Sequence, residues 1–214
     1  MMNFAGKRLL IKIKDQVLYQ TGIWRRRIIK PRLPSNPDGK VYVNLGSGPY
    51  SGKEFINVDI TPFPLIHHIS DVKELKMFAN DSVDFLYSCH VLEHIPRSQL
   101  ASVLKEWRRV LKMGGTLRIS VPDFERLLEV YRASANDADA IVNQLMGQEP
   151  PYDAHYSIWN LTYARKLFSS LGFHNIREWN PDNAPHHDFQ DKSSRKMRAG
   201  DREILISLNI EADK

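Results

Sequence analysis

After residue 40, short apolar runs alternate with longer stretches in which apolar residues recur at helical spacing. Short runs rich in β-branched and aromatic residues are typical of buried strands, and a repeat of three to four residues is typical of amphipathic helices. The pattern predicts strands at 41–45, 55–60, 85–90, 116–121, 175–179 and 203–210, with a strand-like segment at 70–72, and helices at 98–112, 124–147 and 162–171.

Strands that alternate with helices predict an α/β fold, in which a parallel sheet is covered by helices on both faces. Ligands of such sheets bind at the carboxyl ends of the strands, near the point at which the strand order reverses. The chain has 214 residues, which is enough for one domain with a full core and short for two. We therefore expect a single domain at 41–214.

The first 33 residues differ from the rest in charge. They contain nine Lys or Arg and one acid, Asp15, which gives +8, so the remainder carries −3 of the total of +5. Apolar residues lie among the basic ones, and the segment can form a basic amphipathic helix that binds anionic lipid or another polyanion. The alternative is a helix that packs on the domain and keeps its basic side chains in water. Prolines and glycine predict a linker at 34–40 between this arm, 1–33, and the domain.

Composition favours a cytoplasmic location. No run approaches the roughly 18 apolar residues that a membrane-spanning helix needs. Cys89 is the only cysteine, so no internal disulfide can form, and the chain start lacks the apolar core of a signal peptide. The basic arm would allow a peripheral contact with the inner face of the membrane, or with a protein partner.

Three polar features follow the predicted strands. Gly46-Ser47-Gly48 comes directly after the first strand, where glycines let a ligand approach the backbone N–H groups, although a tight turn is an equal alternative. Asp59 ends the second strand and can accept hydrogen bonds from both hydroxyls of a ribose. Asp71 ends the next segment, where a carboxylate can accept from an adenine amino group. Together they indicate a ligand with a ribose and an adenine.

The order of the motifs resembles that of the class I S-adenosylmethionine-dependent methyltransferases. The matching stretches, over about residues 41–180, are VYVNLGSG, INVDI, SDVKEL, DSVDFLYSCHVLEHI, EWRRVLKMGGTLRISVPD and LFSSLGFHNI. More narrowly, they resemble small bacterial type-11-like methyltransferases, which are often predicted from polysaccharide and cell-surface gene clusters. The resemblance implies a Rossmann-like seven-stranded, mostly parallel sheet with an antiparallel last strand. The leading hypothesis is methyl transfer to oxygen or nitrogen of a small-molecule or saccharide acceptor.

The same resemblance implies the residues that bind the cofactor. S-adenosylmethionine, which becomes S-adenosylhomocysteine, would be held by Asn44, Gly46, Ser47, Gly48, Asp59, Ile60, Asp71, Val72, Ser88 and His90. Two positions depart from the family pattern: Asn44 replaces an acid that would pair with the cofactor's ammonium, and Tyr50 replaces a third glycine. A methyltransferase fold without catalysis therefore stays open as an alternative.

The stretch 90–94, HVLEH, has the spacing of an inverted zinc-protease signature. That site needs both histidines and the glutamate on one helix. Here His90 closes a predicted strand, and Pro96 favours a new helix start near residue 98. We therefore expect no metal site. In the family interpretation His90 faces the sulfonium, and Glu93 and His94 line the pocket mouth or form a hydrogen-bonded pair that fixes the loop.

His90, His94 and His155 are the candidate catalytic bases, because an unperturbed histidine pKa of about 6.5 suits proton removal near neutrality. His155 lies in an aromatic-rich insert, 152–159, which forms either a lid over the acceptor or a satellite hydrophobic cluster. Asp123 is expected to cap a helix instead.

Two further histidine pairs, 67–68 and 186–187, are expected to be loop residues, because adjacent histidines point apart and do not chelate alone. The polar segment 181–202 is expected to be a long mobile loop or a flap at the substrate edge.

Two other classes of protein are alternatives. A nicotinamide-dependent oxidoreductase would share the sheet, but the glycine pattern lacks the G-x-G-x-x-G helix entry. A membrane- or polyanion-binding module would act through the basic arm. Nucleic acid is disfavoured as a partner, because the body is net acidic and lacks interleaved aromatic and basic residues.

Overall fold

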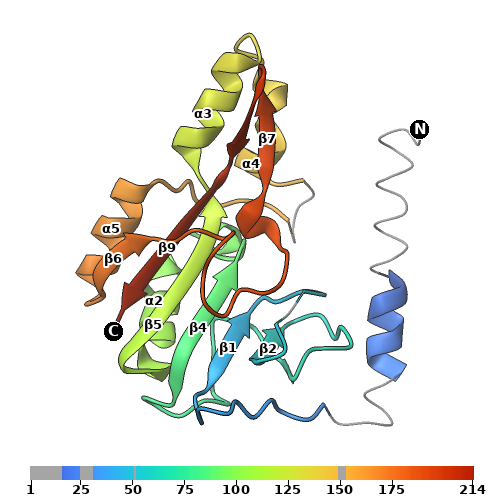
Figure 1. The fold of residues 1–214 in the computed structure, drawn as a ribbon, viewed down its shortest axis with the longest axis vertical. Coiled ribbons are helices and arrows are strands. Elements are labelled where there is room, and N and C mark those ends of the chain that lie inside the picture. Colours follow the sequence, from blue (N-terminus) through green and yellow to red (C-terminus); the bar gives the residue numbers. More distant parts are fainter. Residues whose placement is uncertain (1–15, 25–30, 51, 149–152) are drawn as a thin grey trace.

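The computed structural model describes residues 16–24, 31–50, 52–148 and 153–214, and its centre is a seven-stranded sheet (Figure 1). In sheet order the strands are β3 (His68–Ile69), β2 (Phe55–Asp59), β1 (Tyr42–Leu45), β4 (Val83–Cys89), β5 (Leu111–Pro122), β9 (Ser207–Asp213) and β6 (His174–Glu178). Strands β1 to β5 are parallel, and β9 is antiparallel to β5 and β6. The predicted Rossmann-like sheet with an antiparallel last strand is confirmed.

The strand order reverses beside β1. The chain leaves β1 towards β2 and β3, and then returns to β4 on the other side of β1. All four residues of β1 are buried, which explains why the strand is almost continuously apolar rather than alternating. The carboxyl ends of β1 and β4 therefore form the switch point at which ligands of such sheets bind.

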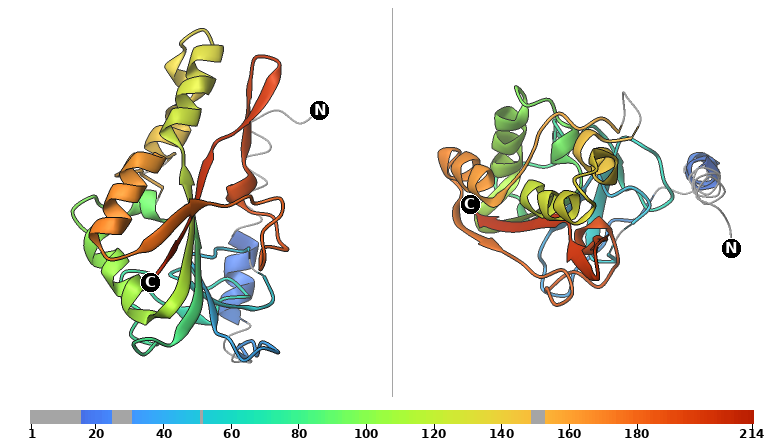
Figure 2. Two further views of the ribbon diagram at one scale, coloured as in Figure 1. Left: turned by 60° about the vertical axis from the view of Figure 1, so that its left-hand side comes forward. Right: turned by 90° about the horizontal axis from the view of Figure 1, so that it is seen from above.

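Two helices, α2 (Leu100–Val110) and α5 (Leu161–Ser170), lie on one side of the sheet (Figure 2). The apolar stripe of α2 faces the core and consists of Leu100, Val103, Leu104, Trp107 and Val110. The predicted helix 98–112 is wrong at its carboxyl end. Leu111 is extended, at φ −66° and ψ 138°, because it already pairs with Val83 as the first residue of β5.

The other face of the central strands carries aromatic side chains. Tyr42, Phe55, Phe85 and Tyr87 pack against Trp179 and Phe189, which follow β6. The segment 179–195 thus forms the layer over these strands, and this segment contains no α-helix. Arg118 Nη1 donates to Pro185 O at 2.6 Å, and Asn209 Nδ2 donates to Ser193 O at 3.0 Å. These bonds fix the segment to the sheet.

A smaller core lies beyond the carboxyl ends of β4 and β5 (Figure 1). It is formed by α3 (Phe124–Ala133), η2 (Ala138–Ala140), β7 (Lys196–Ala199) and β8 (Arg202–Leu205). The short helix α4 (Val142–Met146) follows η2 and has no buried residues. The predicted loop 181–202 is therefore wrong in part, because it contains η3 (Lys192–Ser194) and β7.

Two predicted elements are broken in the structure. The helix 124–147 is interrupted because Ala135 and Asn136 are left-handed, at φ 57° and 60°. The strand 203–210 divides into β8 and β9 around Ile206, whose N–H donates to Arg195 O and whose carbonyl accepts from Asp123 N–H. The second break depends on contacts with residues that are distant in the sequence.

Only part of the basic arm is described. Residues 16–24 are helical, and 1–15 and 25–30 lie outside the described residues. Gly22 lies against the Pro62 carbonyl so closely that a Cβ would be 1.7 Å from its oxygen. Within the described ranges, none of the helices has both the length and the apolar character required to cross a bilayer.

Candidate functional site

The loop after β1 contains two left-handed glycines, Gly46 at φ 66° and Gly48 at φ 54°. A Cβ on Gly46 would lie 2.3 Å from a methyl group of Val91, so both conformation and space require glycine there. Gly48 N–H donates to the Asp59 carboxylate at 2.8 Å, and the other carboxylate oxygen accepts from Thr61 N–H at 2.7 Å. Asp59 therefore fixes the shape of the loop.

The glycine loop lines a cavity of about 170 Å³, which we call the glycine-loop cavity. It lies at the carboxyl ends of β1 and β4, where ligands of such sheets bind. Five of the residues predicted to hold the cofactor line it: Asn44, Gly46, Ser47, Gly48 and His90. The remaining lining residues are Pro49, Tyr50, Tyr87, Cys89, Asp191 and Lys192.

The other five predicted residues do not line this cavity. Asp59 is 9% exposed, and Ile60, next to it, is 59% exposed. Asp71 is exposed and pairs with Lys73 Nζ at 3.3 Å. Val72 is buried in the core, and its carbonyl accepts from the indole N–H of Trp107. Ser88 is buried and donates to Leu45 O at 3.1 Å.

Asp191 and Lys192 were missed from the sequence. They belong to the segment after β6, which folds back over the carboxyl edge of the sheet. The Asp191 carboxylate accepts from Tyr87 Oη at 2.5 Å and from Ser193 N–H at 2.8 Å. Burial, followed by the nearby Cys89 and Asp191, raises the pKa of Tyr87 well above its usual value, so the phenol remains the donor. No local pattern marks an acid that enters a site from so far along the chain.

His90 lies at the inner end of the glycine-loop cavity with a left-handed backbone, at φ 54°. Its Nδ1 lies 3.0 Å from Glu93 Oε1, and its Nε2 lies 3.0 Å from Ser207 Oγ. Ser207 donates its only proton to Lys192 O at 2.7 Å, so Nε2–H of His90 must be the donor to Ser207. Nδ1 and the Glu93 carboxyl group then share the remaining proton.

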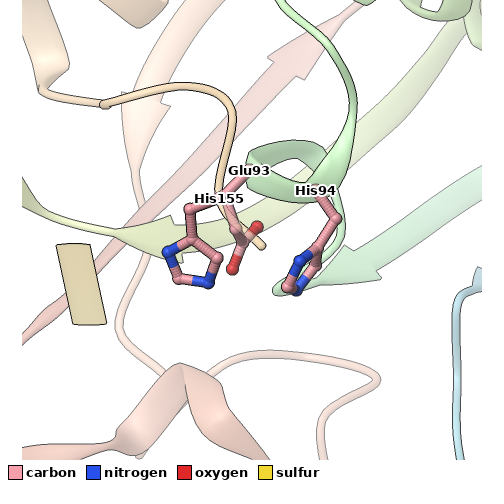
Figure 3. A group of neighbouring side chains, drawn as sticks. All are labelled: Glu93, His94 and His155. Atoms are coloured by element: carbon pink, nitrogen blue, oxygen red, sulfur yellow. The ribbon is translucent and has the colours of Figure 1, made fainter. Parts of the chain in front are cut away.

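Glu93, His94 and His155 gather in one cluster (Figure 3), and Glu93 also contacts His90. Glu93 and His94 belong to η1 (Leu92–His94), and the segment of His155 is joined to η1 by the bond from Tyr156 N–H to Glu93 O, at 2.7 Å. The Glu93 carboxylate is fully buried. Burial alone would raise its pKa, but the adjacent His90 and His94 outweigh that effect and the pKa is lowered. Glu93 and His94 were expected to form a pair, but the structure places both in a larger cluster with His90 and His155.

A second and larger cavity, of about 460 Å³, begins at His155, and we call it the aromatic cavity. Its lining residues are Arg97, Phe124, Leu145, Met146, His155, Tyr156, Ser157, Ile158, Trp159, Asn160 and Tyr163. Asp123 caps α3 by accepting from Glu125 N–H at 3.0 Å, as predicted. The cavity is mostly apolar with a few polar groups, which is typical of a pocket for a small organic molecule.

The histidine pair 186–187 lies in a loop, as predicted, and its side chains have different partners. His186 Nδ1 lies 2.9 Å from Glu54 Oε2, whereas His187 packs among the aromatic rings next to Tyr87. Burial, the largest effect, lowers the pKa of His187. The pair therefore has a packing role in the described structure.

Comparisons with known proteins agree with this geometry. Residues 51–119 match a family model described as "Methyltransferase domain". The comparison with curated proteins gave no match. Among solved structures, the chain is similar to a SAM-dependent methyltransferase from Archaeoglobus fulgidus, with 15% identity and a TM-score of 0.52 over 97% of this chain and 99% of that one.

Two further structures are similar to the chain over most of their length. A SAM-dependent methyltransferase from Methanosarcina mazei has 16% identity and a TM-score of 0.54, over 90% of this chain and 96% of that one. A possible histamine N-methyltransferase from Thermotoga maritima has 13% identity and a TM-score of 0.52, over 99% and 96%. Such low identities show the fold alone.

The family match adds the activity class to this fold. The match of residues 51–119 to a methyltransferase domain, together with the shared fold, supports a class I S-adenosylmethionine (SAM)-dependent methyltransferase, with SAM as the methyl donor. The predicted class, enzymatic activity and cofactor are confirmed.

Proposed function

We propose that the protein transfers the methyl group of SAM to an oxygen or nitrogen atom of a small-molecule or saccharide acceptor held in the aromatic cavity. The observation that supports this is the contact between His90 and Glu93. His90 lines the glycine-loop cavity, and Glu93 lies beside His155, which lines the aromatic cavity. A donor site and an acceptor site thus meet at one side-chain contact, as a direct displacement requires.

The glycine-loop cavity fits the amino-acid end of SAM. Asp191 and Lys192 place a carboxylate and an ammonium in the same cavity, and these match the opposite charges of an α-amino acid. Asp191 therefore supplies the charge that Asn44 lacks. The volume of about 170 Å³ suits this part of the cofactor only. The adenosine would extend along the edge at Asp59, Ile60 and Asp71.

The bound cofactor supplies an electrophilic methyl group on a sulfonium, and the protein aligns the acceptor and removes its proton. We assign the removal of the acceptor's proton to His155, which lines the aromatic cavity, and to His94, which lies next to it in the same cluster. Burial, the largest effect, lowers the pKa of His155, so its imidazole is neutral at pH 7. His90 holds Glu93 in place, and the exposed side chains of Tyr156 and Ile158 offer an acceptor an apolar surface.

The test combines calorimetry with a transfer assay. SAM and S-adenosylhomocysteine are titrated into the full chain, and methyl-labelled SAM is incubated with panels of hydroxylated aromatics, amines and saccharides. We expect both ligands to bind and one panel to become labelled. Binding without transfer to any panel would favour the non-catalytic fold, and no binding of either ligand would refute the proposal.

A further inference from the structure

We propose that Glu93, His94 and His155 bind a divalent transition-metal ion. Each residue offers one ligand atom, and these atoms all lie within 4.8 Å of one another. Figure 3 shows the carboxylate of Glu93 between the two imidazole rings. Two imidazoles and one carboxylate form a common protein ligand set for zinc and for non-haem iron.

Both histidines are held in the tautomer that metal binding needs. His94 Nδ1 lies 3.1 Å from Ala154 O, and His155 Nδ1 lies 2.9 Å from Gln144 O. A carbonyl oxygen can only accept, so each Nδ1 carries a proton, and in the neutral imidazole each Nε2 then carries the lone pair. Metal-binding histidines almost always donate their other ring N–H in this way, which fixes the orientation of the ring.

Glu93 provides the independent observation. Its side chain has no exposed surface, and neither carboxylate oxygen has a hydrogen-bond partner of good geometry among the described residues. His90 Nδ1 approaches Oε1 at 3.0 Å, which accounts for one oxygen at most. In their neutral forms, the imidazoles of His94 and His155 bring further lone pairs to within 4.8 Å of the Glu93 ligand atom. Lone pairs that converge in a buried site are costly unless a proton or a cation lies between them.

An ion pair with His90 is the simplest alternative, and it does not account for the whole cluster. It compensates the charge of Glu93 but leaves two neutral imidazoles facing a carboxylate. A cation satisfies all three groups, and His90 then becomes the partner that orients the carboxylate. The sequence predicts no metal site because the ligands of the zinc-protease signature must lie on one helix. In the structure the third ligand, His155, comes instead from the segment after α4.

Three protein ligands leave coordination positions open. Asp153 Oδ1 lies 3.8 Å from His94 Nε2 and is the nearest additional carboxylate. Because His155 also lines the aromatic cavity, an open position would be accessible to the acceptor. This step rests on the proposed function, and it favours an acceptor with a hydroxyl group. Metal binding lowers the pKa of a hydroxyl.

The chemistry of that step is balanced. With the ion bound, the Nε2 lone pairs of His94 and His155 are coordinated and no longer take the proton. The hydroxyl proton leaves to water, the acceptor oxygen forms a bond to the methyl carbon, and the carbon–sulfur electron pair returns to sulfur, which gives neutral S-adenosylhomocysteine. No oxidant or reductant is needed.

The test uses the full chain after chelator treatment and buffer exchange. Co²⁺ is titrated and followed by its visible absorption, and bound Zn²⁺ is measured by elemental analysis. We expect one equivalent of either ion per chain. His155→Ala and His94→Ala should weaken Co²⁺ binding by more than about 100-fold, which exceeds the about 10–100-fold typical of outer-sphere partners. His174→Ala, at an exposed position on β6, is the matched control and should bind normally.

Less than a tenth of an equivalent in the unaltered chain, or unchanged binding in His155→Ala, would overturn the proposal. Circular dichroism of each variant separates a lost ligand from a lost fold, and Glu93→Gln provides a variant of almost unchanged size. SAM calorimetry on the same metal-free protein separates the two proposals. SAM binding without metal binding refutes only the metal site, and metal binding without SAM binding refutes only the proposed function.

Discussion

Nδ1 of His90 lies 3.0 Å from Oε1 of Glu93, and both side chains are almost fully buried. A buried carboxylate that loses its partner keeps the cost of burial, which is typically about 3–5 kcal/mol. In metal-free protein, His90→Ala should therefore lower the free energy of unfolding by about 3 kcal/mol. Urea unfolding measures this change.

The double variant His90→Ala/Glu93→Gln provides the control. A neutral amide needs no charged partner, so the double variant should lose less than the sum of the two single losses. Strictly additive losses would show that the contact contributes no coupling, and the assignment of His90 as the residue that holds Glu93 would then fail.

Gly46 is the position in the glycine loop with the least tolerance for a side chain. Gly46→Ala combines a left-handed φ of 66° with a Cβ that would lie 2.3 Å from Val91. Gly39→Ala is the matched control, because Gly39 has φ 70° and open space around its Cβ. The control should lose about 1 kcal/mol of stability, as strained backbone positions do. Gly46→Ala should lose at least about 1 kcal/mol more, because of the overlap, and should also lose SAM binding.

Chemical unfolding and calorimetry with SAM provide both readouts. Equal losses in the two alanine variants would mean that Val91 moves aside freely. The double variant Gly46→Ala/Val91→Ala should recover the part of the loss that comes from overlap.

The sheet could be predicted because its signals are local. Short apolar runs bounded by glycine and proline mark β1, β2, β4 and β5 within a few residues. The break after α3 was missed: Asn136 is a residue type that tolerates a left-handed backbone, but Ala135 carries no such mark. Alanine is a good helix former, so its left-handed backbone at residue 135 runs against its intrinsic preference.

The candidate site could be predicted only where it follows a strand directly. The glycine loop and His90 come at the ends of β1 and β4, so topology alone places them at one edge. Asp191 and His155 reach the same region from segments that no periodicity connects to it. Their positions depend on hydrogen bonds such as Tyr87 Oη to Asp191 and Tyr156 N–H to Glu93 O. These pairs have no trace in local sequence.

Tyr42 should make the protein sensitive to alkali. Its side chain is buried, and burial, with help from the hydrogen bond to Asp38, raises the pKa of Tyr42 from 10.0 to about 12. The unfolded chain therefore releases this proton first, so the stabilisation is complete below pH 10 and is lost as the pH rises towards 12. The loss is up to about 3 kcal/mol. Urea midpoints of Tyr42→Phe should fall less steeply between these pH values, and an unchanged slope would contradict the assignment.

Tyr156 tests the acceptor side of the proposed function. Its ring lines the aromatic cavity and is 48% exposed, so it can stack on an acceptor without being needed for the core. Tyr156→Ala should raise KM for the acceptor found in the transfer assay by about tenfold, as the loss of one aromatic contact does. SAM affinity should not change. Ile69→Ala, at a residue of β3 that is 51% exposed and outside the cavity, is the control. A changed SAM affinity with an unchanged KM would place the acceptor elsewhere.

Asp191 tests the donor side. If its carboxylate pairs with the ammonium of SAM, Asp191→Asn should weaken SAM binding about tenfold to 100-fold, which corresponds to the 1.5–3 kcal/mol of a charged hydrogen bond. The amide oxygen can still accept from Tyr87 Oη and Ser193 N–H, so the fold should be kept. Asp188→Asn removes a nearby exposed charge of the same sign and should leave SAM affinity unchanged. This control excludes a general change in the electrostatic potential of the protein as the cause of weaker SAM binding. If Asp191→Asn bound SAM as tightly as the unaltered chain, the charge missing at Asn44 would have to be supplied by another residue.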